Sequence, residues 1–457
     1  MTTESGTLAG NPTAILADWA AGVRLADIPE AIRERAIDLL LDAIAVALAA
    51  DRAEEMAAVD RFATVLGDWP NTTVIGQAGR RSAAAATLLN AYRITALTAC
   101  DVYTSAHFHV TPEVVPPALA VAEELRSDGA ALLTSLAVGF EVATRVAAGL
   151  RYSAFRARGW HSPGVAGPFG GAAAVGQLRG LGPDPMRNAL GLAGSQSAGT
   201  WASWGTPTVK FHQARAALSG LLAGNLAATG FSAADDILAN PDGGLLHAYS
   251  DGGEPAAITA DLGRRWELER ISLRPWPGAT PLQPVITGLF RLIADGTLVA
   301  PHAGGVRIFV APSVHDQHAR FRHPSGTFEA MLSIDYAAAA ILTFGRLGFE
   351  EFTPAVYNRD DLARRIDDQI MLAPDPELTP LQCRLEVDGS PPRTLTVDRP
   401  KGHPDDPASR SLLSDKLRAC AAGVLTPAAV ESLLGSIERI AELDDLAPVF
   451  ALMRTDL

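Results

Sequence analysis

Residues 28–50 read IPEAIRERAIDLLLDAIAVALAA, and the pattern of this run is that of a core helix. Apolar residues recur every three or four positions, and Pro29 and Glu30 stand where a first helical turn would hold them. The second half carries Asp42 and is shorter than the ~20 apolar residues that cross a bilayer, so we expect no membrane partner. Such a run is typical of a helix buried in a large bundle.

Helical spacing continues on both sides of this run, from about residue 12 to residue 230, and returns after residue 405. Between them, short segments rich in β-branched residues alternate with helical stretches. We therefore predict a mainly α protein: a large helical domain at 1–265, completed by a tail at 406–457, with a smaller α+β domain inserted at 266–405. The predicted strand segments are ELERISLRP (267–275), GGVRIFVAP (304–312), QCRLEVDG (382–389) and RTLTVDR (393–399).

The composition excludes several classes of protein. The 457 residues are 48% hydrophobic and 19% charged, as in a globular protein, and the net charge of −13 argues against a nucleic-acid partner. Cys100, Cys383 and Cys420 are too few and too scattered for a disulfide framework or a thiolate metal cage. The first residues lack the basic and apolar regions of a signal peptide, so we expect a soluble, cytoplasmic protein.

The chain has only three lysines. Lys401 lies in a polar stretch and Lys416 on a charged helix, and both are predicted to be exposed. Lys210 instead ends the apolar and hydroxyl-rich run WASWGTPTVK, just before a predicted buried helix. Because a desolvated ammonium is costly without an anion, either an internal ion pair or a bound substrate carboxylate is expected there.

The segment DVYTSAHFHVTPE (101–113) places Asp101, His107 and His109 in one loop between two helices. It is either a reactive loop or a polar loop in which Thr111 caps the following helix. The two histidines also permit a metal site, although no further ligand spacing supports one.

The segment RGWHSPGVAGPFGG (158–171) places His161 ahead of a glycine-rich helix. No strand precedes the glycines, which argues against a nucleotide site and favours a helix packed closely against its neighbours. A histidine at the start of such a helix is either a structural group or an acid/base group.

Taken in order, these segments resemble the MmgE/PrpD family over nearly the whole chain. The Asp101–His109 loop resembles the family's aspartate-rich turn followed by His-Pro, RGWH resembles its Arg-x-x-His segment, and Lys210 resembles its lysine before a Gly/Ala-rich helix. Arg274 in LRPWPGATP resembles its Lys-x-(Tyr/Phe)-Pro corner, and Tyr336 in Ser-Ile-Asp-Tyr its Ser-x-x-Tyr helix.

Four positions depart from the family pattern. Asp101 stands alone where the family has several aspartates, and the corner lysine is Arg274. A histidine often found shortly after that corner is Gln283, and Lys210 is one residue nearer to His212 than in many relatives. These departures leave the expected fold unchanged and bear on the substrate and the reaction.

The resemblance implies a homodimer with an active site between its domains and with no metal or organic cofactor. It also implies reactions that make or quench a carbanion next to a carboxylate. We expect a lyase that dehydrates or decarboxylates a small di- or tricarboxylate; an epimerase is the first alternative. A metal hydrolase and a non-catalytic binding protein are the other classes left open. The implied roles are acid/base catalysis by His109 and His161, orientation or base catalysis by Asp101, hydrogen-bond or proton donation by Tyr336, and substrate binding by Lys210, Arg274 and His107.

Overall fold

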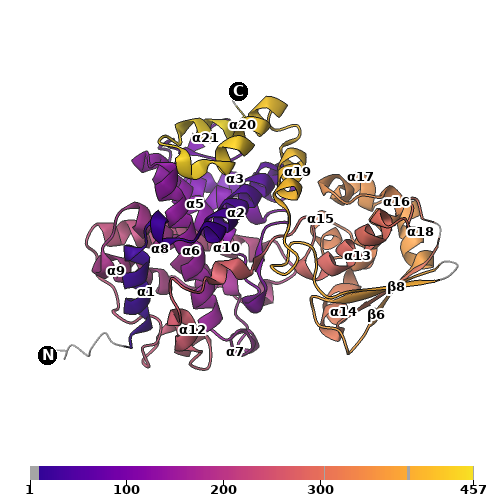
Figure 1. The fold of residues 1–457 in the computed structure, drawn as a ribbon, viewed down its shortest axis with the longest axis horizontal. Helices are drawn as coiled ribbons and strands as arrows, with labels where there is room; N and C mark the ends of the chain where they lie inside the picture. The colour runs from indigo at the N-terminus through magenta and orange to yellow at the C-terminus, as the bar shows by residue number, and fades with distance from the viewer. Residues whose placement is uncertain (1–9, 303, 389–391, 456–457) are drawn as a thin grey trace.

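The computed structural model describes residues 10–302, 304–388 and 392–455. A larger helical part is joined to a smaller part that holds a β-sheet, which confirms the mainly α architecture (Figure 1). The predictions about residues 1–9, and the end of the predicted strand at 382–389, fall partly or wholly outside the described residues. The domain boundaries at 265 and 405 stay predictions.

Helix α2 (Glu30–Leu48) runs through the interior of the helical part, and every residue from Leu39 to Leu48 is buried. Beside it lies α6 (Gly129–Gly149), which is long and apolar enough to cross a membrane. However, 89% of its most apolar window is buried inside the protein, as in the core helix of a folded domain. The other helices of this part include α1 (Pro12–Gly22), α3 (Met56–Ala63), α4 (Ala83–Thr95), α5 (Thr111–Leu125), α7 (Tyr152–Ala157), α9 (Pro183–Gly194), α11 (Leu245–Tyr249) and α12 (Pro255–Thr259).

Helices α8 (Ser162–Leu178) and α10 (Thr208–Ala228) cross at two glycines. A Cβ atom on Gly220 would lie 2.8 Å from the Cα atom of Gly171, closer than a side chain permits. The glycine-rich helix is therefore packed against its neighbour, as predicted. This crossing brings the residues that begin the two helices to the same end of the bundle.

The C-terminal helices return to the helical part, where α19 (Arg410–Ala421) lies against α2. The prediction that Lys416 is exposed is wrong. Its buried ammonium lies 2.5 Å from Asp42 Oδ1 and donates to the carbonyls of Ala99 and Arg274. The charged residues beside Lys416 in the sequence face solvent, and helical periodicity turns Lys416 toward α2. Two short helices follow, α20 (Pro427–Glu438) and α21 (Ala447–Leu452).

The smaller part contains a four-stranded sheet with the order β6-β5-β7-β8. The strands predicted at 304–312, 382–389 and 393–399 are present as β5, β7 and β8. Strand β6 was not predicted, since it follows the end of a helix at Gln369 directly, is largely unburied and ends at a proline. Only β5 and β6 are parallel; the other neighbours are antiparallel. The bounds are β5 (Val306–Val310), β6 (Ile370–Pro374), β7 (Cys383–Val387) and β8 (Arg393–Val397).

Helices cover one face of this sheet (Figure 1). Contacts join α13 to β7 and β8, and α16 to β6. Their bounds are α13 (Gln283–Ala294), α14 (Pro312–His318), α15 (Thr327–Ala330), α16 (Ile334–Phe344), α17 (Pro354–Tyr357) and α18 (Asp360–Gln369).

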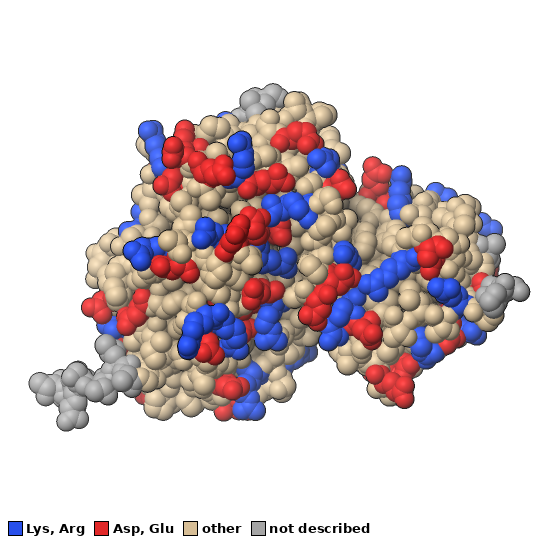
Figure 2. Space-filling view, in the orientation of Figure 1, with Lys and Arg blue, Asp and Glu red and all other residues tan. Residues whose placement is uncertain are grey.

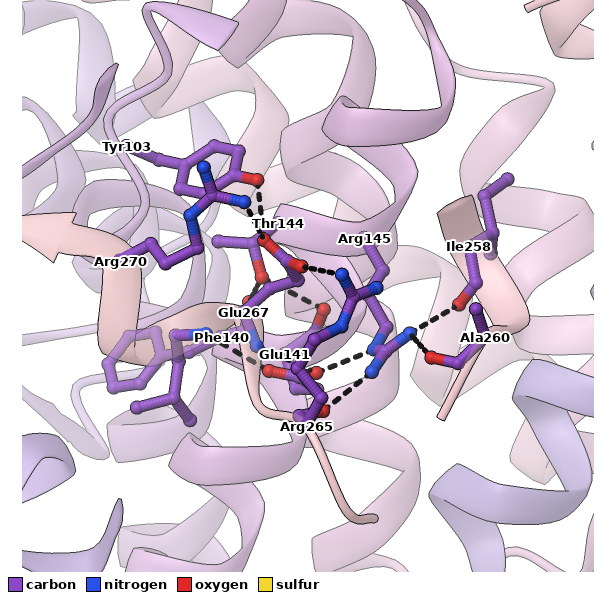
Figure 3. A network of polar contacts seen from close by, with 11 residues as sticks. Tyr103, Phe140, Glu141, Thr144, Arg145, Ile258, Ala260, Arg265, Glu267 and Arg270 are labelled. Atoms are coloured by element: carbon purple, nitrogen blue, oxygen red, sulfur yellow. Dashed lines mark hydrogen bonds and ion pairs between the residues drawn. The ribbon is translucent and has the colours of Figure 1, made fainter. Parts of the chain in front are cut away.

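The predicted strand at 267–275 is reduced to β4 (Ile271–Ser272), which pairs with β3 (Val102–Tyr103) outside the main sheet. A buried polar network holds this junction (Figure 3). The Tyr103 hydroxyl donates to Glu267 Oε2 at 2.7 Å, and Glu141 of α6 accepts the backbone N–H groups of Glu267 and Leu268. The loop that follows β3 is thereby fixed relative to the corner that follows β4. On the outer surface, charges of both signs are interspersed over the face shown in Figure 2.

Candidate active site

A cavity of about 150 Å³ lies between the helical part and the sheet-containing part. The helical part contributes His107, His109, His161 and Lys210, and Arg274 comes from the corner after β4. Four segments that are distant in sequence therefore meet at one site. The structure brings together these five predicted residues; it places Asp101 and Tyr336 elsewhere. The cavity is also lined by Trp201, Trp204, Gln213, Gln317, His318 and Phe328.

Asp101 does not line the cavity, and its carboxylate stabilises the loop that carries His107 and His109. Its carboxylate accepts the backbone N–H groups of Val110 at 2.8 Å and Thr111 at 3.0 Å, and the Thr111 hydroxyl at 2.5 Å. The polar group that caps α5 is thus Asp101 and not Thr111. Burial raises the pKa of Asp101 to about 6, against the opposing effect of these three donors. Fully buried, Asp101 contacts the loop rather than the cavity.

The same loop fixes the tautomer of His109. Its Nδ1 atom lies 2.6 Å from the carbonyl oxygen of Asp101. A carbonyl can only accept, so Nδ1 carries the hydrogen and Nε2 of the neutral ring is left with a free lone pair. Burial and the nearby charge of Arg274 lower the pKa of His109 to about 3. His109 is therefore a neutral imidazole that presents an acceptor at neutral pH.

His161 is the residue that precedes α8, and its backbone N–H donates to the carbonyl of Gly199. Its Nδ1 atom lies 3.1 Å from Nδ1 of His212 on α10. Burial first, and then the charges that His212, His109 and Arg156 would carry, hold the pKa of His161 well below its usual range. The crossing of α8 and α10 thus delivers a second neutral imidazole to the cavity.

Lys210 is the first of two buried cations that line the cavity. Its ammonium donates to the carbonyl of Ala96 and lies 4.5 Å from the centre of the Phe328 ring. Within the described ranges it forms no ion pair with a carboxylate, so the expected internal ion pair is absent there. Burial lowers the pKa of Lys210, while Glu55 and Glu54 favour its charged form. The ammonium keeps free donors for an anion in the cavity.

Arg274 is the second buried cation of the cavity, and like Lys210 it donates to backbone carbonyls. Its guanidinium donates to the carbonyl of Cys100 at 2.5 Å, to that of Gly278 at 3.3 Å and to the Cys100 sulfur at 3.4 Å. None of the carboxylates in the described part of the chain pairs with it. Because an arginine has five N–H donors, this arrangement leaves donors for a carboxylate.

Two cavity residues have backbone conformations that are unfavourable for their type. Thr98 has φ +50° and His107 has φ +44°, and neither is a glycine. Such conformations cluster at functional sites, where the surrounding structure holds them. The ring of His107 lies 4.7 Å from that of Tyr152, which supports its orientation.

Tyr336 does not reach the cavity. It is fully buried on α16, and its hydroxyl donates to the carbonyl of Glu351. The Ser333 side chain accepts the backbone N–H of Tyr336 and caps α16. In this conformation both residues of the Ser-x-x-Tyr motif support α16.

Sequence reasoning missed Trp204 and His318. Trp204 directly follows the short helical turn Trp201–Ser203, and the indoles of Trp201 and Trp204 stack with ring centres 6.1 Å apart. His318 ends α14 and meets Trp204 edge to face at 6.2 Å. The only signal for the tryptophans was their place beside Lys210 in WASWGTPTVK, and nothing in HDQH distinguished His318 from its neighbours. Among residues 10–302, 304–388 and 392–455, no group of three or more His, Cys, Asp or Glu side chains is arranged to hold a metal ion.

Two family models together match most of the chain. The MmgE/PrpD N-terminal domain matches residues 14–257, and the MmgE/PrpD C-terminal domain matches residues 276–440. A cis-aconitate decarboxylase-like protein, oryM, of Aspergillus oryzae is 28% identical over the full length of both chains. The cis-aconitate decarboxylase of Aspergillus terreus is 26% identical, covering 96% of this chain and 95% of its own. The human cis-aconitate decarboxylase is 24% identical, covering 95% of this chain and 92% of its own. The protein belongs to the MmgE/PrpD family.

Proposed function

We propose that the protein is a lyase that decarboxylates a small unsaturated tricarboxylate such as cis-aconitate. The observation that carries this proposal is the pair of buried cations, Lys210 and Arg274, which have no carboxylate partner among the described residues and line one cavity with four histidines. Buried cations of this kind need an anion. The decarboxylase names of the relatives support the choice of substrate and reaction.

Substrate binding follows from the position of the two cations. Arg274 offers planar donors that suit two oxygens of one carboxylate, and Lys210 offers a compact point charge to another. Both cations line the cavity, so one substrate can contact both. A third carboxylate, not neutralised by either cation, is then the group that can leave.

The chemistry requires a stabilised electron pair and a proton. When the bond between the leaving carboxylate and its neighbouring carbon breaks, CO₂ departs and the electron pair remains on carbon. The double bond delocalises this pair toward another carboxylate, where a fixed cation in a partly dry site stabilises it. A protonated imidazole then supplies the proton that forms the new C–H bond. A bound polyanion favours protonation of the imidazoles near it, among them His109 and His161.

The reaction on this proposal uses no added metal or organic cofactor and takes place in the cytoplasm. Dehydration and epimerisation would use the same cations and the same imidazoles, so the reaction class must be separated by its products. A binding protein without activity would use the cations alone.

The deciding experiment is incubation of the purified protein in D₂O with cis-aconitate and with a panel of saturated di- and tricarboxylates that includes β-hydroxy acids. Decarboxylation predicts release of CO₂ and one deuterium on the product carbon, at a rate that dialysis against EDTA leaves unchanged. Loss of water without CO₂ would establish a dehydratase, and deuterium exchange without loss of either would establish an epimerase. Thermal stabilisation by cis-aconitate without turnover would establish a binding protein. Each of these three results would overturn the decarboxylase.

A further inference from the structure

We propose that His318 is a further catalytic residue, which delivers the proton to the carbon that has lost CO₂. This inference rests on the proposed decarboxylation. His318 ends α14 in the sheet-containing part, whereas His107, His109 and His161 all come from the helical part. It therefore supplies the cavity with an imidazole that the helical part does not carry.

The contacts of His318 leave one ring nitrogen free. Its Nδ1 atom donates to the carbonyl of Leu332 at 2.7 Å, so Nε2 of the neutral ring carries the lone pair. Nε2 contacts no described hydrogen-bonding group, and it is not among the fully enclosed unpartnered polar atoms of the described residues. Since His318 as a whole is only 2% exposed and lines the cavity, the free nitrogen opens into that cavity.

His109 has the same tautomer as His318, because its Nδ1 atom donates to the Asp101 carbonyl and leaves the lone pair on Nε2. Their electrostatic surroundings differ. The charge of Arg274 disfavours a protonated His109, and His161 already shares its Nδ1 with His212. Burial and, to a smaller extent, the charge of Arg320 lower the pKa of His318, while its hydrogen bond to the Leu332 carbonyl favours the protonated form.

The charged groups near His318 are Arg320 and the groups that line the cavity. Arg320 follows His318 by two residues, and its guanidinium lies over two aromatic rings, 5.1 Å from the centre of the Trp204 ring and 4.7 Å from that of Phe321. The other charged or titratable groups that face the cavity with His318 are Lys210, Arg274, His107, His109 and His161. In the bound state one carboxylate pairs with Lys210 and another pairs with Arg274. The third carboxylate of a tricarboxylate keeps its negative charge, and this charge favours the protonated form of His318.

The protonated His318 gives its Nε2 hydrogen to the carbanion carbon. The new C–H bond uses the electron pair left by CO₂, and the ring becomes neutral. Water returns a proton to the ring after the product leaves. Decarboxylation thus consumes one proton from solvent in each turnover.

The test uses His318→Gln in the full-length protein, with His315→Gln as the matched control. His315 lies on the same helix, its side chain is 29% exposed, and it does not line the cavity. With cis-aconitate, His318→Gln is expected to lower kcat by about 10²- to 10⁴-fold, to change KM by less than about threefold and to remove one limb of the kcat pH profile. His315→Gln is expected to match the parent in all three. Unchanged kcat and pH profile in His318→Gln would overturn the assignment.

A second measurement does not depend on turnover. Calorimetric titration with tricarballylate, a saturated tricarboxylate, in two buffers of different ionisation enthalpy measures the protons taken up on binding. His318→Gln should take up fewer protons than the parent, and His315→Gln should take up the same number. Equal uptake by parent and His318→Gln would contradict the role of His318. If the parent fails to release CO₂ but His318→Gln still lowers proton uptake, the proposed function falls and the protonation of His318 stands.

Discussion

The Nδ1 atoms of His161 and His212 lie 3.1 Å apart, so one imidazole must donate to the other. The two rings come from the start of α8 and the first turn of α10, and His212 is only two residues beyond Lys210. The contact therefore fixes the position of an imidazole relative to a buried cation. Because two protonated rings at this separation would repel each other, the pair holds at most one extra proton.

Replacing His161 with Ala should mainly lower kcat, by about 10²-fold or more, because an acid/base group is lost while both cations remain. Steady-state kinetics with cis-aconitate measure this. His323→Ala is a suitable control, since His323 is exposed and pairs with Asp367. A His161→Ala variant with the parental kcat would remove His161 from the catalytic assignment.

Replacing Lys210 with Ala should raise KM by about 10- to 150-fold, because a charge-assisted hydrogen bond of about 1.5–3 kcal/mol to a carboxylate is lost. The control is Lys401→Ala, whose ammonium pairs with Asp406 away from the cavity. Measurement of KM for cis-aconitate in both variants is sufficient. An unchanged KM in Lys210→Ala would show that no carboxylate reaches this ammonium.

Replacing Lys416 with Met should lower the free energy of unfolding by about 3–5 kcal/mol, because Asp42 is left as a buried, unpaired charge. The double variant Asp42→Asn with Lys416→Met should lose less than the single one, since it removes both charges. Urea unfolding measures each. Equal losses in the single and double variants would show that the ion pair is not what the single substitution breaks.

Acid should destabilise the protein through His109. Its pKa is lowered to about 3 in the folded state from about 6.5 in the unfolded chain. Between these values the unfolded chain binds a proton that the folded protein does not, so stability falls as pH decreases from 6.5 toward 3. His109→Gln should flatten this dependence by up to ~1.4 kcal/mol per pH unit. Asp101, whose pKa is raised to about 6, acts in the opposite direction in both proteins and cancels in the comparison. Parallel curves of unfolding free energy against pH would contradict the burial of a neutral His109.

The homodimer stays a prediction, and α10 offers a surface on which to test it. Leu222 is 50% exposed and Leu226, one turn later, is 40% exposed. Apolar side chains at this spacing are typical of a helix that packs against a partner. Light scattering should give a dimer for the parent and a monomer for Leu222→Glu combined with Leu226→Glu. A dimer of unchanged stability in the double variant would place the interface elsewhere.

Much of the fold could be predicted because helical periodicity and β-branched segments are local properties of the chain. The strand at 267–275 could not be predicted correctly, since the pairing of β4 with β3 depends on a contact across about 170 residues. Lys416 shows the same limit: its partner Asp42 lies 374 positions away. A charged stretch of helix cannot reveal which one of its charges is buried.

The cavity residues could be predicted where a polar group stood out from an apolar or glycine-rich setting, as Lys210 and His161 do. Asp101 met that criterion too, but the direction of its carboxylate toward the start of α5 is set by the folded loop. His318 could not be predicted, because its proposed role depends on a contact of the folded chain: its Nδ1 atom donates to the Leu332 carbonyl, which leaves Nε2 free.

The most direct measurement is a crystal structure of the protein with tricarballylate bound, because this saturated acid has the carboxylates of the proposed substrate without its reactivity. One carboxylate should lie within hydrogen-bonding distance of Lys210 Nζ and another should contact the guanidinium of Arg274, with the carbon chain between His109 and His318. A ligand that occupied the cavity and left both cations untouched would contradict the carboxylate-binding role on which the proposed decarboxylation depends.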